Sequence, residues 1–131
     1  MSAFSNYLEA AICNWLRGTA MPSAPAALYV ALFNGDPTDT GTGGTEVTAT
    51  IRAAGRVAGA FGAPNDGVIK NSAVVNYGAA AASATVSHFA LFDAASGGNL
   101  LMYGALTGGA QSIGANTNVS FPVDSLTLTV Q

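Results

Sequence analysis

Side chains that could do catalytic chemistry are scarce in this 131-residue sequence. It contains one histidine, His88, and one cysteine, Cys13, so a nucleophile activated by an imidazole base must use His88. His88 stands in an apolar run that predicts a central strand, where a buried or subunit-facing histidine is the simpler interpretation. Cys13 lies beside the apolar stripe of a predicted helix, which favours a buried, unreactive thiol. We therefore expect no catalytic residue.

The acidic residues are the second possible source of chemistry. Asp36, Asp39 and Glu46 fall in one loop at 34–46, but their spacing does not match the ligand positions of an EF-hand. The Gly-Thr-Gly-Gly segment of this loop lacks the Gly-Lys-Ser/Thr of a phosphate-binding loop. A glycan-cleaving enzyme needs two carboxylates on facing strands, and only Asp93 lies near the predicted central strands. The sequence therefore predicts no metal site, no cofactor site and no enzyme.

The composition limits the classes of partner. Charged residues make up 8% of the chain, against about 25% in a typical domain, and hydrophobic residues make up 50%. A soluble monomer normally keeps a charged surface, so we expect other copies or partners to cover part of this one. The net charge is −3 and the basic residues form no run, which disfavours nucleic acid. No apolar stretch reaches the roughly 18 residues of a membrane span, and no signal peptide is visible.

One segment, residues 5–17, shows a clear helical pattern. Ser5 or Asn6 can cap its start, Asn6 with Glu9 approximates a capping box, and Gly18 is a natural stop. The apolar residues form a single stripe: Phe4, Leu8, Ala11, Ile12, Trp15 and Leu16. We expect this stripe to pack on the chain's own sheet. The alternative is a helix that docks on a neighbouring subunit.

Residues 83–107 predict a central hairpin around which the chain is organised. The first limb begins with apolar residues on alternate positions, Ala84 and Val86, but from His88 to Phe92 almost every residue is apolar. The second limb, Leu100–Leu106, is apolar on both faces, so we expect this part of the sheet to be covered on both sides. The turn between them, 93–99, supplies Asp, Gly and Asn. Further strands are predicted at 28–33, 46–53, 56–62, 68–77, 117–123 and 126–130. About eight strands predict a mainly β fold, an antiparallel β-sandwich or barrel-like domain with one N-terminal amphipathic helix. We expect one domain, 1–131, with the helix in 1–18 and the strands in 27–131.

An ordered set of segments covers most of the chain: Ser5–Glu9, Asn14–Leu16, Tyr29–Phe33, Asp36–Asp39, Gly41–Val47, Val86–Ala94 and Ser96–Thr107. Together these segments resemble a family of small tailed-bacteriophage virion proteins, often labelled tail-fibre-like or minor structural proteins. Residues 49–63 depart from that family's pattern of an aromatic-Ala-Arg strand start followed by polar strands. The resemblance implies a structural role in the particle and no enzymatic activity.

The place on the particle is a separate question. A fibre shaft needs a long repeating pattern, and none is visible. We therefore predict a capsid decoration (cement) protein that stabilises the head by binding major capsid subunits. The alternative is a small tail or tail-fibre-associated component, including a host-binding knob. We expect a homo-oligomer, with a trimer favoured, and the major capsid protein or tail proteins as partners, without nucleic acid or membrane. The expected location is the virion, at the capsid surface or the tail, after synthesis in the host cytoplasm.

Overall fold

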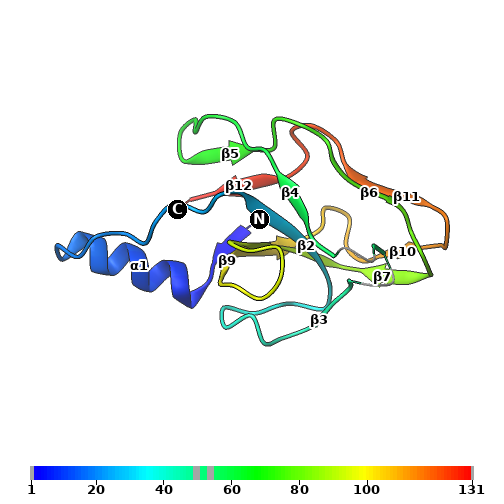
Figure 1. Cartoon of the computed structure of the whole chain (residues 1–131), viewed down its shortest axis with the longest axis horizontal. Helices are drawn as coiled ribbons and strands as arrows, with labels where there is room; N and C mark the ends of the chain where they lie inside the picture. The colour runs from blue at the N-terminus through cyan, green and yellow to red at the C-terminus, as the bar shows by residue number, and fades with distance from the viewer. Residues whose placement is uncertain (1, 49–50, 53–54, 131) are drawn as a thin grey trace.

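The computed structural model describes residues 2–48, 51–52 and 55–130. Figure 1 shows one N-terminal helix beside a body built from short strands. The elements are β1 (Ser2–Phe4), α1 (Asn6–Leu16), β2 (Leu28–Asn34), β3 (Thr45–Glu46), β4 (Val57–Gly59), β5 (Val68–Lys70), β6 (Val75–Ala79), β7 (Ala84–Val86), β8 (His88–Phe92), β9 (Leu100–Ala105), β10 (Gln111–Ile113), β11 (Asn118–Phe121) and β12 (Thr127–Thr129). Every ladder between these strands is antiparallel. The predicted mainly β fold with an N-terminal helix is confirmed.

Most of the predicted hairpin, 88–105, lies at the centre of the largest sheet, but the start of its first limb, Ala84–Val86, forms β7 and pairs with β10 in a separate ladder. The strand order of the largest sheet is β1-β9-β8-β2-β3, and β4 also pairs with β2. β8 is hydrogen-bonded on both sides, with Ala90 opposite Ala31 of β2 and Tyr103 of β9. A strand paired on both edges and covered on both faces has no wet side, which explains its unbroken apolar sequence.

One face of this sheet carries the main core. Three two-stranded ladders, β10-β7, β11-β6 and β12-β5, supply residues that face it, which gives a sandwich-like arrangement. Alternate residues of the central strands point into this core, for example Val30, Leu32, Phe89 and Leu91. The ladders contribute its other buried side chains, including Val75, Tyr77, Val86, Leu126 and Leu128.

The opposite face of the sheet carries a second, smaller cluster of Ala31, Phe33, Ala90, Phe92 and Leu100. The acidic loop 34–46 lies over this face instead of projecting into solvent: Pro37 is buried, and a Cβ added at Gly41 would come 3.3 Å from the Leu100 side chain. Most residues of 34–46 are nevertheless exposed, so this segment is a surface loop that also covers part of the apolar face. The chain itself supplies the cover that the apolar hairpin required.

A buried asparagine holds the C-terminal segment on the main core. Asn71, which follows β5, is 0% exposed and donates from its amide to the carbonyls of Ala73 and Pro122 at 2.9 and 2.8 Å. Its Oδ1 accepts the backbone N–H of Leu126 at 2.8 Å. These bonds, with the β12-β5 ladder, fix residues 122–126 against the sandwich.

Several short elements differ from the sequence prediction. Residues 2–4 form edge strand β1, and β10 lies inside the predicted loop 108–115. The strand predicted at 46–53 is confirmed only at its start, where Glu46 belongs to β3 and the Val47 N–H bonds to Leu32 O. Beyond it, the N–H groups of Ile51 and Arg52 both bond to Thr48 O, which is a turn, while 49–50 and 53 lie outside the described residues. Elements of three residues carry too little periodicity to read from sequence.

Candidate interaction surfaces

The lone histidine has a structural partner. His88 is half-buried at the start of β8, and its Nδ1 lies 2.8 Å from the Ser87 hydroxyl. The same hydroxyl accepts the backbone N–H of Gly35 at 2.8 Å, so Ser87 joins β8 to the start of the loop 34–46. Within the described part of the chain, no hydrogen bond or ion pair connects His88 to a carboxylate. The Ser87–His88 pair therefore lacks the third group that orients a catalytic imidazole.

The three carboxylates of the acidic loop point to different partners. Asp36 accepts the N–H of Thr38 at 2.8 Å, and Asp39 accepts the hydroxyl of Tyr103. The hydrogen bond to Asp39, followed by burial, raises the pKa of Tyr103 to about 12. In the residues that can be described, no three His, Cys, Asp or Glu side chains gather as a metal site would require. Asp39 instead fastens the loop to β9 through Tyr103, while Asp36 holds a turn within the loop.

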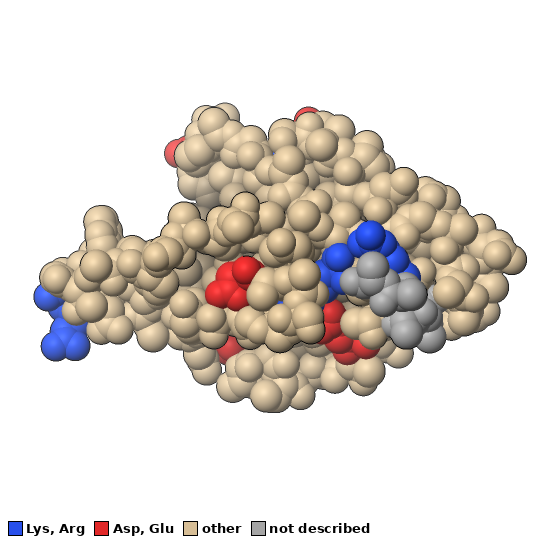
Figure 2. Space-filling view, in the orientation of Figure 1, with Lys and Arg blue, Asp and Glu red and all other residues tan. Residues whose placement is uncertain are grey.

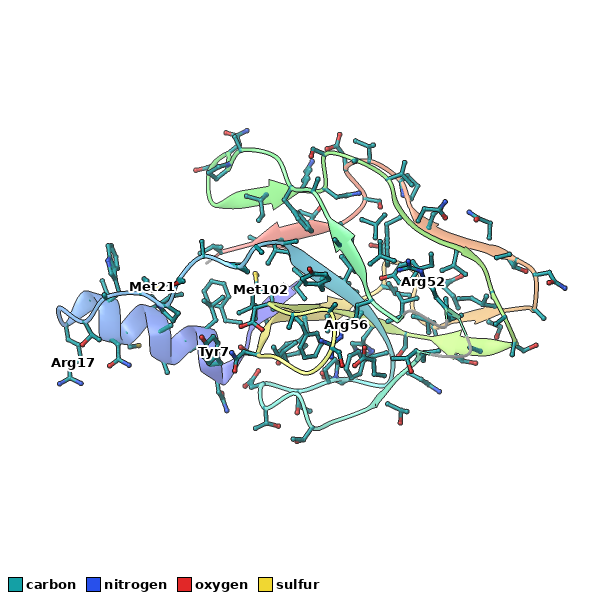
Figure 3. All side chains as sticks on the ribbon, in the orientation of Figure 1. Tyr7, Arg17, Met21, Arg52, Arg56 and Met102 are labelled. Atoms are coloured by element: carbon teal, nitrogen blue, oxygen red, sulfur yellow. The ribbon has the colours of Figure 1, made fainter. Side chains whose placement is uncertain are left out.

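Arg56 connects Glu46 to the turn of the central hairpin, and the sequence did not predict this connection. Its guanidinium forms a two-point ion pair with Glu46, with both N–O distances at 2.9 Å, and donates to the carbonyls of Ala94 and Gly97. It also lies 3.6 Å over the ring of Phe92, where a cation–π interaction adds to the pairing. Only 7% of the Arg56 side chain is exposed, and Figure 3 shows it within the body of the molecule. No local pattern identifies this partnership, because its members are far apart in sequence.

Asp93 closes the central hairpin turn. Its two oxygens accept the backbone N–H and the side-chain amide of Asn99 at 2.7 and 2.9 Å. The hydrogen bond from the Asn99 side chain, with that from its backbone, lowers the pKa of Asp93. This carboxylate therefore fixes the turn.

The helix carries the chain's most exposed apolar surface. Ser5 is the N-cap, accepting the N–H of Leu8 at 3.2 Å and donating to Leu100 O, so the predicted capping box of Asn6 and Glu9 does not form. The helix ends before Gly18, whose φ is +100°. α1 extends away from the sheets, with Tyr7 near its start beside the body and Arg17 at its projecting end (Figures 1 and 3).

The expected burial of the whole helix stripe is wrong. Phe4 and Leu8 pack against the main core and Ala11 is buried, but Trp15 is 59% and Leu16 72% exposed. Cys13, predicted to be buried, is exposed as well. Because α1 follows edge strand β1 directly, only its first turns lie against the sheet, and the last turn passes beyond it. Among the described residues, no helix is long and apolar enough to cross a bilayer.

A cavity of about 410 Å³ opens between β11 and the ends of β9 and β10. Its buried walls include Leu32, Val86, Phe89 and Leu126. Half-exposed apolar residues and exposed polar ones surround them: Leu106, Ile113, Val119, Phe121, Thr107, Gln111, Thr117, Asn118, Ser120, Ser125 and Thr127. None of the described residues that line the cavity is charged. A site of this size and chemistry fits an uncharged, largely apolar group.

The face shown in Figure 2 is mostly uncharged, with small, separate clusters of acidic and basic side chains. The chain matches a family model described as "Podophage GP4 fiber I protein gp80" over residues 3–129. The chain belongs to this family. A comparison with curated proteins finds no match.

Membership of this fibre protein family makes the chain a phage structural protein of tail-fibre-like type. It confirms the resemblance to tailed-bacteriophage virion proteins that the sequence showed. The family description names a fibre, so it agrees better with the tail or tail-fibre alternative than with capsid decoration. The prediction of no enzymatic activity also agrees with a structural family.

Proposed function

We propose that this chain is a non-enzymatic component of a podophage tail fibre, or of the tail structure that carries the fibre. The single observation that carries the proposal is the match of a fibre protein family to residues 3–129. The contacts of the polar side chains support the proposal. A hydrogen bond or ion pair that joins one segment of the chain to another is made by each of Ser87, Asp39, Glu46 and Asp93. A virion component needs such a fixed shape more than it needs a reactive centre.

We also propose that the protein works as a homo-oligomer, with three copies as the favoured number because trimers suit tail appendages. Two features support self-association. Charged residues are only 8% of the chain, and the helix exposes large apolar side chains to solvent. The tail proteins of the same particle are the expected further partners.

The test is the location of the protein on the particle. Purified virions are disrupted, heads and tails are separated, and the protein is located in the two fractions by mass spectrometry and on intact particles by immunogold electron microscopy. The proposal expects the protein with the tails, while the major capsid protein, as the control, stays with the heads. Recovery with the heads alone would reject the fibre assignment in favour of capsid decoration, and absence from the particle would reject both.

A further inference from the structure

We propose that copies of this chain join head to tail, with the Trp15–Leu16 end of α1 from one copy seated in the uncharged cavity of the next. The two features lie toward opposite ends of the long axis: α1 at one end, and β7, β10 and β11 toward the other (Figure 1). Such a contact joins two different surfaces, so it closes into a ring or continues as a chain of copies. The inference concerns how copies associate and does not depend on where in the particle they sit.

The first half of this contact is a solvent-exposed apolar projection. Trp15 and Leu16 are 59% and 72% exposed and occupy the last turn of the helix, beyond the support of the sheet. The Trp15 indole makes no hydrogen bond within the described part of the chain, which leaves its N–H free to donate. Tryptophan is the side chain most enriched at the centres of interfaces, because it combines a large apolar area with one polar donor.

The second half is the cavity between β11 and the ends of β9 and β10. Its volume of about 410 Å³ lies in the range of about 300–1,000 Å³ typical of small-ligand sites, which admits an indole ring. Phe89 and Leu126 offer apolar contact within it, and the amides of Gln111 and Asn118 at its rim provide oxygens that can accept the indole N–H. A second hollow, about 430 Å³, is lined by Lys70 and Asp124 and suits an apolar group less well.

A second copy is the occupant that accounts for both features at once. A different protein docked on α1 would leave the cavity unexplained, and a ligand in the cavity would leave Trp15 in solvent. Pairing two helices side by side would bring together only an exposed last turn, because an 11-residue helix is about 16 Å long and its first turns already contact the body. Stable interfaces bury about 1,200–2,000 Å² in total, and two exposed last turns paired with each other offer little toward that area.

The experiment uses the chain's only tryptophan as its own probe. In the wild-type protein, the Trp15 emission should shift to shorter wavelength as concentration rises, in step with an increase in mass by light scattering. Trp15→Ala should weaken self-association about 30-fold or more, as expected for a central interface residue. Val74→Ala, at a position that is 56% exposed on the body, is the matched control and should associate as the wild type does.

A second set of variants obstructs the cavity with a charged side chain. Ile113→Lys introduces a charge into the cavity lining. If this variant does not fold, Thr107→Arg introduces a charge at an exposed lining position, where the fold should tolerate it. Circular dichroism checks the fold of each variant. Each variant with an obstructed cavity should be monomeric alone, because no copy can accept the helix of another. Its own helix stays intact.

Mixing then separates head-to-tail association from the alternatives. Trp15→Ala keeps an open cavity and the variant with an obstructed cavity keeps its tryptophan, so the two should form one complex of two chains, twice the 13.0 kDa chain mass, and grow no further. The remaining Trp15 emission should shift on mixing. The inference is overturned if the wild type stays monomeric at every concentration, if either variant associates normally, or if the mixture forms no complex.

Discussion

Removal of the buried Asn71 side chain should destabilise the fold severely. Asn71→Ala deletes three hydrogen bonds, those to Ala73, Pro122 and Leu126. At about 1 kcal/mol each they sum to about 3 kcal/mol, and the Leu126 N–H left without its partner adds about 1–3 kcal/mol. We expect a loss of about 4–6 kcal/mol in the free energy of unfolding, a large part of the roughly 5–15 kcal/mol that small domains possess.

The measurement is urea unfolding followed by far-ultraviolet circular dichroism. Tryptophan fluorescence cannot be used, because Trp15 is the chain's only tryptophan and is replaced in the background used for this comparison. The comparison is made in a Trp15→Ala background so that self-association does not add to the measured stability. Asn118→Ala, which removes an exposed asparagine from β11, is the matched control and should change stability by no more than about 0.5 kcal/mol. Equal effects from the two variants would refute the role assigned to Asn71.

Asn71→Asp tests the direction of the hydrogen bonds. The introduced carboxyl still accepts the N–H of Leu126 but loses the donors that face Ala73 O and Pro122 O. Burial and the lost donors should raise its pKa above the ordinary value of about 3.9. The variant should therefore be least destabilised below about pH 4 and lose stability, relative to the parent, as pH rises through the raised pKa. A penalty that did not change with pH would contradict this reasoning.

Three further outcomes follow from the structure. Arg56→Met should cost about 2–4 kcal/mol, because it removes a nearly buried ion pair and two bonds to the hairpin turn, whereas Arg56→Lys should keep part of this; equal losses in urea unfolding would contradict the two-point pairing. Leu128→Asp should prevent folding, as judged by circular dichroism, while Thr127→Asp on the exposed side of β12 should be far milder, and equal damage would show that the facing is wrong. The pKa of Tyr103 is raised from 10.0 to about 12, so its contribution to stability is complete below pH 10 and is lost as pH rises through about 12; thermal melts across this window should fall less steeply for Tyr103→Phe than for the wild type.

The general architecture was predictable because it depends on local patterns. The run at 28–33 and the two apolar parts of the predicted hairpin, 88–92 and 100–105, are too apolar for any place except the centre of a sheet, and they form β2, β8 and β9 there. Ser5 and Gly18 bound the helix because capping depends on neighbouring residues. The alternation of Val119 and Phe121 with polar residues likewise predicted β11.

Other features depend on pairings between distant residues, which no local pattern contains. The sequence by itself determined a mainly β chain with one amphipathic helix and a set of segments that resembles phage structural proteins. It also showed a content of charged residues that is low for a monomer whose whole surface faces solvent. Only the tertiary structure decided that loop 34–46 covers the second face of the sheet, because that cover depends on contacts such as Asp39 with Tyr103 and Glu46 with Arg56. It also decided that Trp15 is exposed and that a cavity lies at the other end, since an amphipathic stripe specifies an apolar face but not how far the supporting sheet extends.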